Sequence, residues 1–346
     1  MPILPALAVV MALGASPAPR VVDLPMPPML AFPAEAPPVI DAAAWIVWSV
    51  DQNAELGAFN ADDVRAPASI TKLMTAMLVV ENAAPAETVT ISARAGSTPV
   101  GYVGQPQLRQ GEVWTVRDLL ANILVQSGND AAVALAEHVA GSVEAFVAMM
   151  NARASELGMT STVFVTPNGL DAEGHVMSAR DIVAMGEASL AYPDILRMTR
   201  VKRITFDVGD RHIEVDATNR DLGVFPGLFG LKTGDTIGAG QTLLAYDVAQ
   251  HGSLLSVVLG SAGRLGATRE LLAWAWSALG PRDYFFAPVV GTDLELLFPD
   301  WYVTRLRAAG ALPTGDPVAP EATPLSDAVN SRLRGLLPAL LGGDGS

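Results

Sequence analysis

A hydroxyl and an amine stand one helical turn apart in Ser69-Ile70-Thr71-Lys72, at the start of an aliphatic segment that runs to Asn82. The segment predicts a buried helix, and burial lowers the pKa of a lysine because it disfavours the charged form. A lysine in that state can accept the proton of a nearby hydroxyl as a general base. The pattern therefore indicates a nucleophile at Ser69 with Lys72 as its base, although a capping serine followed by a surface lysine would give the same four letters.

A second hydroxyl and an amide occur in Ser127-Gly128-Asn129, between two stretches with helical periodicity. The hydroxyl could relay a proton to a leaving amine, and the side-chain amide of Asn129 could bind the acyl part of a substrate. Taken alone, the motif is better explained as an ordinary turn in which Asn129 caps the next helix.

A third motif, Lys232-Thr233-Gly234, begins a predicted strand. A glycine in a strand lets another backbone approach closely, and a lysine beside a threonine offers a site for a carboxylate. The strand would pair with an extended peptide and hold its terminal carboxylate near Lys232. Taken alone, the motif also fits a strand-edge lysine followed by a turn glycine.

Composition narrows the partners that the chain can have. The 346 residues carry a formal net charge of −14, with 22 Lys and Arg against 36 Asp and Glu. A nucleic-acid partner needs a basic face, so this balance argues against one. The chain has no cysteine, and its four histidines are scattered without the spacing of metal ligands. The sequence thus excludes a cysteine nucleophile, and we expect neither a metal nor another cofactor.

Segments with the pattern of strands come before and after a middle stretch whose segments have the pattern of helices. This order predicts a mixed α+β fold in which distant segments complete one sheet. The expected strands are 43–50, which leads into a hairpin turn near Asn53, a pair around a Gly-Asp turn in 203–215, and three more within 230–262. The expected helices are 68–82, 115–126, 129–141, 142–159 and 267–279, with Thr115 and Ser142 as N-caps and Gly141 as a stop.

The flanks suggest targeting and linker segments. Residues 1–18 form an apolar run followed by small residues, which predicts a signal peptide and export to the periplasm or cell envelope; a buried N-terminal segment is the alternative. Residues 19–39 are Pro-rich and predict a linker, 40–280 form the expected catalytic domain, and 281–346 form a short C-terminal extension. An amphipathic helix is expected at its end, where an apolar stripe favours a packing face over a peripheral membrane anchor and leaves membrane association open. The stripe comprises Leu325, Val329, Leu333, Leu336 and Leu340.

The order and separation of the three motifs resemble one known family. With 55 positions from Lys72 to Ser127 and 103 from Asn129 to Lys232, the chain resembles serine-type D-alanyl-D-alanine carboxypeptidases, the low-molecular-mass penicillin-binding proteins. The likeness extends over residues 40–280 and includes FVTPNGLDAEGHVMSARD and GLKTGDTIGAGQTLLAY. The resemblance implies a β-lactamase/transpeptidase-like fold, with an antiparallel sheet flanked by helices, a helical lobe, and the site at their junction.

The resemblance also implies roles for the residues of the first two motifs. Ser69 resembles the acylated nucleophile and Lys72 its base. Ser127 resembles the proton shuttle, and Asn129 resembles the ligand of a substrate amide. The implied reaction removes the terminal D-Ala from a peptidoglycan stem peptide that ends in D-Ala-D-Ala, through an acyl-enzyme. β-Lactams are expected to inhibit by acylating the same serine.

The third motif and its neighbour receive binding roles from the same resemblance. Lys232 and Thr233, beside Gly234, resemble the residues that bind the substrate carboxylate. The backbone N–H groups of Ser69 and Asp235 are implied to form the oxyanion hole. The Asp235 side chain fits this less well, because it puts an anion near an anionic substrate.

Three other functions share these motifs and stay open. A D,D-endopeptidase would cut peptidoglycan cross-links with the same residues. A class A-like β-lactamase would need a glutamate and an asparagine in an E-x-x-L-N pattern, and the nearest candidate, Glu156 to Thr160, lacks the asparagine. A cell-wall binding protein could keep the fold without the activity, although it would be expected to lose part of the triple.

Overall fold

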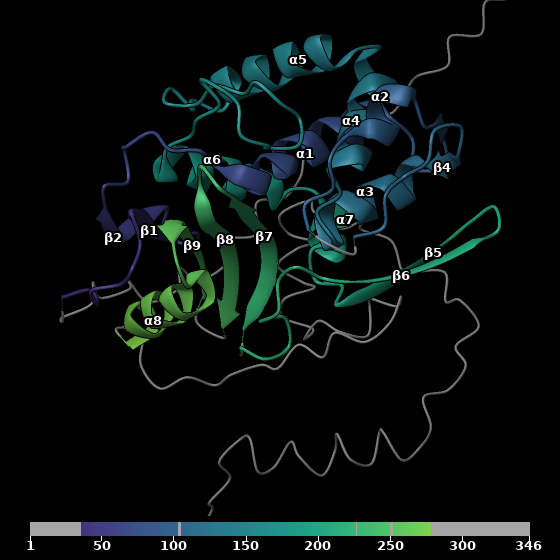
Figure 1. The fold of residues 1–346 in the computed structure, drawn as a ribbon. Helices are drawn as coiled ribbons and strands as arrows, with labels where there is room; N and C mark the ends of the chain where they lie inside the picture. The colour runs from purple at the N-terminus through teal and green to yellow at the C-terminus, as the bar shows by residue number, and fades with distance from the viewer. Residues whose placement is uncertain (1–35, 103–104, 226, 250–251, 278–346) are drawn as a thin grey trace, which may run out of the picture.

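A five-stranded antiparallel sheet lies at the centre of the computed structural model, which describes residues 36–102, 105–225, 227–249 and 252–277 (Figure 1). Its strand order is β2-β1-β9-β8-β7. The first strand therefore pairs with its neighbour in the chain and with the last strand, which confirms the α+β fold completed by distant segments. The strands are β1 (Ala44–Ser49), β2 (Ala54–Phe59), β7 (Leu228–Thr236), β8 (Gly240–Ala249) and β9 (Gly252–Ser261).

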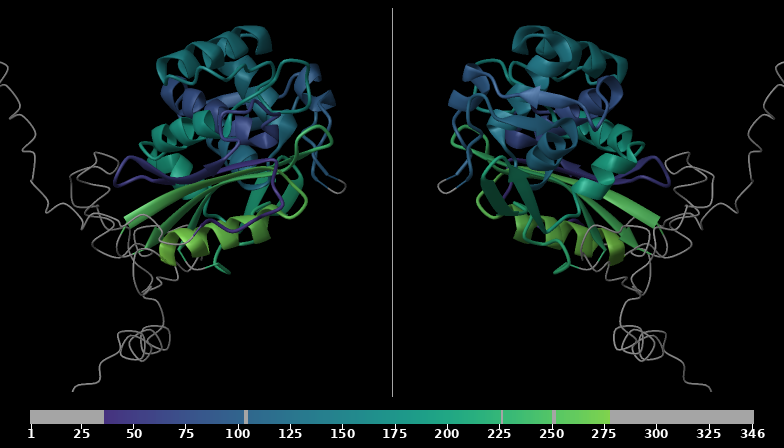
Figure 2. Two further views of the ribbon diagram at one scale, coloured as in Figure 1. Left: turned by 90° about the vertical axis from the view of Figure 1, so that its left-hand side faces the viewer. Right: turned by 90° about the vertical axis from the view of Figure 1, so that its right-hand side faces the viewer.

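Strand β1 is buried on both faces because helices cover the sheet on both sides. Trp45 and Val47 belong to the apolar cluster that contains Leu271 of α8 (Arg264–Ser277). Ile46 belongs to the larger core on the opposite face, where α6 (Ala179–Ser189) packs. Figure 2 shows the sheet edge-on, between α8 and the helical lobe. This position explains why the sequence of β1 shows little polar–apolar alternation.

The helical lobe follows the predicted capping pattern. Thr115 Oγ1 accepts from Asp118 N at 3.1 Å, and Ser142 Oγ accepts from Ala145 N at 3.1 Å. Gly141 ends its helix at a φ of +76°, a conformation that glycine adopts without strain. The helices are α1 (Lys72–Asn82), α2 (Ala93–Ser97), α3 (Val116–Val125), α4 (Asn129–Ala140), α5 (Val143–Glu156) and α7 (Pro193–Met198).

Two small antiparallel pairs border the lobe. Strands β3 (Thr88–Thr90) and β4 (Val113–Thr115) form one pair. The other pair, β5 (Arg203–Val208) with β6 (Arg211–Asp216), is the hairpin predicted around the Gly-Asp turn, and it projects from the body of the molecule (Figure 1). Residues on this hairpin reach the cavity described below.

Two motif residues occupy other positions in their elements than the sequence predicts. The helix expected over 68–82 begins as a 3₁₀ turn, η1 (Ala68–Thr71), because Ala68 has a φ of +51° that a regular helix cannot include. Lys232 is expected at the start of a strand but lies within β7, which begins at Leu228. An irregular register between Leu228 and Leu231 separates the two parts of β7, and the glycines of this stretch concealed the strand from a pattern-based prediction.

The predicted signal peptide (1–18), nearly all of the Pro-rich linker (19–39) and the C-terminal extension (281–346) lie outside the described residues. Within the described part, no single helix is both long and apolar enough to cross a membrane. The helices α4 and α5 meet that criterion only as a pair, and their axes are bent by 86°.

The cap at Ser142 gives a test of the helical lobe. We expect Ser142→Ala to lower the free energy of unfolding by about 1 kcal/mol, because the first turn of α5 loses a hydrogen-bond acceptor. Ser142→Gly should cost only a few tenths of a kcal/mol, roughly, since glycine leaves the N-terminus open to water. Urea titration of both variants and the wild type measures these losses, and a Ser142→Ala variant as stable as the wild type would show that the cap contributes nothing.

Candidate active site

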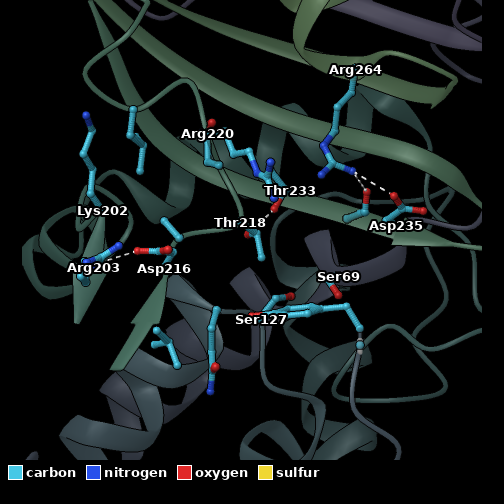
Figure 3. Close-up of a pocket in the computed structure, with 18 of the residues that line it drawn as sticks. Ser69, Ser127, Lys202, Arg203, Asp216, Thr218, Arg220, Thr233, Asp235 and Arg264 are labelled. Atoms are coloured by element: carbon cyan, nitrogen blue, oxygen red, sulfur yellow. Dashed lines mark hydrogen bonds and ion pairs between the residues drawn. The ribbon is translucent and has the colours of Figure 1, made fainter. Parts of the chain in front are cut away.

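The three motifs meet at one cavity of about 1220 Å³, between the free edge of β7 and the helical lobe. Ser69 and Ser127 line it from the lobe side, and Thr233 and Asp235 line it from the strand (Figure 3). Lys72 and Lys232 lie buried behind these residues. All eight residues singled out in the sequence are thus brought together: Ser69, Lys72, Ser127, Asn129, Lys232, Thr233, Gly234 and Asp235.

The Lys72 ammonium has no solvent exposure and three oxygen partners. Its Nζ lies 2.8 Å from Ser69 Oγ, 2.7 Å from Asn129 Oδ1 and 2.6 Å from the Asn168 carbonyl oxygen. The Asn129 amide is held in this orientation because its Nδ2 donates to the Pro99 carbonyl at 3.0 Å. The lysine is therefore fixed by oxygens from three separate segments.

The hydrogen-bonding capacity of these three partners determines which of them the lone pair of an uncharged Lys72 faces. An uncharged amine has two N–H bonds and one lone pair. The oxygens of Asn129 and Asn168 can only accept, so they take the two N–H groups, and the lone pair is left for the Ser69 hydroxyl. The pKa of Lys72 is held well below its usual value, first by burial and then by the charge of Lys232. Both effects favour the uncharged form that a general base requires.

A second amine–hydroxyl pair lies beside the first. Lys232 Nζ donates to Ser127 Oγ at 2.9 Å and to the Thr233 carbonyl at 3.0 Å. Burial, followed by the nearby charge of Arg264, lowers the pKa of Lys232 to about 7. Ser127 adopts a φ of +67°, which is uncommon for a residue with a side chain and fixes its hydroxyl at the end of α3. A proton could therefore pass between this amine and a group bound at Ser127.

Gly234 allows β7 to lie directly against the turn that carries Ser69. A Cβ at this position would lie 2.8 Å from the Ser69 nitrogen and 2.8 Å from the Ala68 Cβ. Any side chain would therefore push the strand away from η1. The close approach brings β7 at Gly234, the residue before Asp235, against the Ser69 nitrogen.

Arg264 and Asn168 are site residues that the sequence analysis missed. Arg264 Nη1 donates to the Gly234 carbonyl at 2.8 Å and pairs with the Asp235 carboxylate at 3.5 Å, so a cation balances the anion expected there. A lone arginine at the start of a helix gives no sequence signal for this role. Asn168 contributes a backbone oxygen, which any residue could supply.

The described residues contain no group of three His, Asp or Glu side chains that could hold a metal ion. The groups of the first two motifs and Lys232 form amine–hydroxyl and amine–amide hydrogen bonds beside the cavity. This set suits covalent chemistry on a carbonyl compound that carries a carboxylate.

Comparison with known proteins gives the same family from sequence and from structure. A family model described as D-alanyl-D-alanine carboxypeptidase matches residues 31–263. The D-alanyl-D-alanine carboxypeptidase DacC of Escherichia coli is 35% identical over 259 residues, which is 69% of this chain and 62% of the relative. The chain spans only 62–64% of the length of the first curated relatives that it matches.

Solved structures show the same fold. Penicillin binding protein 6B of Escherichia coli is 36% identical with a TM-score of 0.63, over 69% of this chain and 78% of that one. Penicillin-binding protein D2 of Listeria monocytogenes, solved in an ampicillin-bound form, is 32% identical with a TM-score of 0.60, over 68% of this chain and 98% of that one. The fold expected from the resemblance is thereby confirmed.

The loop that supplies the Asn168 carbonyl offers a paired test. Gly169 has a φ of +79°, and its Cβ would lie 2.0 Å from the Ala68 carbonyl oxygen; Gly174 has a similar φ of +78° with open space around it. Gly174→Ala should cost about 1–2 kcal/mol of unfolding free energy from backbone strain alone. Gly169→Ala should cost at least about 1 kcal/mol more, because the loop must also move away from η1. Equal losses in denaturant titrations would contradict this packing.

Proposed function

Because the chain belongs to the D-alanyl-D-alanine carboxypeptidase family, we propose that it is a serine D,D-carboxypeptidase that removes the terminal D-Ala from peptidoglycan stem pentapeptides. One observation carries the proposal: two amine–hydroxyl pairs, Ser69 with Lys72 and Ser127 with Lys232, share a single cavity. The first pair can form an acyl-enzyme, and the second can protonate the amine that leaves.

In the proposed acylation, Lys72 takes the Ser69 proton as the hydroxyl attacks the carbonyl of the penultimate D-Ala. The lone-pair direction derived above supports this role, because the other two positions on Nζ are occupied by Asn129 and the Asn168 carbonyl. The developing oxyanion would be bound by the N–H groups of Ser69 and Asp235. Loss of one such donor typically costs about 2.7–4 kcal/mol of transition-state stabilisation.

The substrate carboxylate would lie against Lys232, Thr233 and the free edge of β7. The Thr233 hydroxyl is already oriented by a 2.6 Å hydrogen bond to Thr218, and the charge of Arg264 lies close behind. Ser127 would pass a proton to the D-Ala amine, after which water releases the acyl group. The Asn129 Nδ2 has a second hydrogen beyond the one donated to Pro99, and that hydrogen would bind the substrate's acyl amide.

The same proposal extends to inhibitors and location. We infer that β-lactams acylate Ser69, since they present an amide beside a carboxylate and a relative was solved with ampicillin bound.

Residues 40–280 would act as the catalytic domain of an exported, periplasmic or envelope protein. Residues 1–18 would serve as its signal peptide, residues 19–39 as a linker and residues 281–346 as an extension. Fractionation of the full-length chain and of a chain without that extension tests whether the extension contacts a membrane.

A β-lactamase is less well supported than a carboxypeptidase. Glu156, the nearest candidate for the activating glutamate, lies at the end of α5, where it pairs with Arg153 at 2.9 Å and is largely exposed. Cleavage of cross-links and simple binding use the same cavity, and only substrates separate them.

Ser69→Ala tests the nucleophile. We expect covalent labelling by a fluorescent penicillin to vanish and D-Ala release from a stem pentapeptide to fall by at least about 10³-fold. Ser155→Ala, on the exposed face of α5, serves as the matched control and should label normally. Labelling that persists without Ser69 would remove it as nucleophile. Preferred cutting of a cross-linked dimer would show an endopeptidase, and rapid turnover of penicillin would show a β-lactamase.

The lowered pKa of Lys232 predicts that kcat/KM declines on the alkaline side of the pH profile. Below about pH 7 the amine is charged and attracts the carboxylate, so kcat/KM should fall as the pH rises through this value. Arg264→Gln removes a repulsive charge, and the fall should then move to higher pH. Arg197→Gln changes a solvent-exposed side chain on α7 that pairs with Asp194 and should leave the profile unchanged. A limit that stays in place in Arg264→Gln would rule out Lys232 as its source.

A further inference from the structure

His175 is a buried ring that belongs to none of the three motifs. It is 3% exposed and lies in the loop after Phe164, whose ring centroid is 5.9 Å from its own. The loop runs beside η1 and carries the Asn168 carbonyl that accepts from Lys72. His175 therefore lies next to the reacting groups without lining the cavity that holds Ser69.

The hydrogen bonds of the ring define its proton. Nδ1 lies 2.9 Å from the Val165 backbone nitrogen and 3.3 Å from that of Thr166. Backbone N–H groups can only donate, so Nδ1 must accept and carries no proton. The proton of the neutral ring is then on Nε2, which donates to Thr71 Oγ1 at 2.8 Å.

Thr71 connects this ring to the nucleophile. It is fully buried in η1, directly before Lys72. The same loop contacts this segment twice more, through the Pro167 carbonyl at 2.6 Å from Thr75 Oγ1 and the Asn168 carbonyl at 2.6 Å from Lys72 Nζ. On the loop side, those two contacts use backbone oxygens, which a substitution in the loop does not remove. The contact of the His175 side chain with Thr71 is the one of the three that a substitution in the loop can remove.

We propose that His175 is a positioning residue, whose neutral ring ties Thr71 to the loop and so holds Lys72 against the Asn168 carbonyl with its lone pair aimed at Ser69. The inference rests on the proposed acyl-enzyme chemistry. It assigns to the loop a function in catalysis. If η1 moved away from the loop, Lys72 and Ser69 would lose the geometry that proton transfer needs, while the binding groups on β7 would stay in place.

The electrostatic surroundings keep the ring neutral. Burial lowers the pKa of His175 to about 4, the nearby charge of Lys72 adds to this, and Asp171 acts in the opposite direction. A protonated ring would also point an Nδ1–H at the Val165 N–H group. The bond to Thr71 is therefore present throughout the neutral pH range.

Two substitutions separate the two edges of the ring. His175→Asn keeps an acceptor near the Val165 nitrogen and loses the reach to Thr71, whereas His175→Gln keeps a donor that reaches Thr71. We expect His175→Asn to slow acylation by penicillin and kcat for D-Ala release by roughly tenfold or more, with KM changed less than about threefold. His175→Gln should recover most of the rate. His138→Asn, on α4, is the control and should keep the full rate.

Thr71→Val tests the bond from its other end. It should reproduce the loss, and the double variant with His175→Asn should be no slower than the worse single variant, within about threefold. Losses that multiply in the double variant, a rate that His175→Asn leaves unchanged, or a Gln variant no better than Asn would each overturn the proposal. Thermal unfolding checks that the variants are folded. A wild-type chain that penicillin does not acylate would refute the proposed function itself, which is a different outcome.

Discussion

The burial of one amine among oxygen atoms is the constraint on which the rest of this structure depends. Lys72 has no contact with water, and an amine in that position without partners would cost several kcal/mol, roughly. Its three oxygen partners come from η1, from the start of α4 and from the loop at Asn168, so the cost is avoided only when all three segments meet. The same contacts that bring these segments of the lobe together thus also set the direction of the Lys72 lone pair.

Local charge at the cavity is opposite to that of the whole chain. The protein carries a net charge of −14, yet Lys232 lies buried within β7 beside the cavity and Arg264 lines it. Burial first, and then the charge of Arg264, lowers the pKa of Lys232 to about 7. The carboxylate of Asp235, which seemed from the sequence to oppose an anionic ligand, is paired with Arg264. The net charge of the chain therefore argues against a nucleic-acid partner, whereas the electrostatics of the site depend on individual neighbouring charges.

Residue types with a local signal were predictable, and groups defined only by tertiary structure were not. The serine, lysine and glycine positions of the three motifs follow from spacing, and the caps at Thr115 and Ser142 follow from the start of a helical pattern. The Asn168 carbonyl has no residue-type signature. Arg264 lies 30 positions after Gly234 and outside the three motifs, so no spacing pattern singles it out. Strand β1 lacked alternation because both of its faces are covered, which a single sequence cannot reveal.

The order of the central sheet has a consequence for the timing of assembly. Strand β1 pairs with β9 from Ala44 opposite Leu259 to Ser49 opposite Leu254. One edge of the first strand therefore has no partner until residues more than 200 positions later in the chain are available. Contacts between such distant segments form slowly. Trp45 and Val47 also await their cover from α8. In a chain that is still being synthesised, the central sheet is consequently incomplete until β9 and α8 have been made, and β1 lacks both a strand partner and the cover of one face until then.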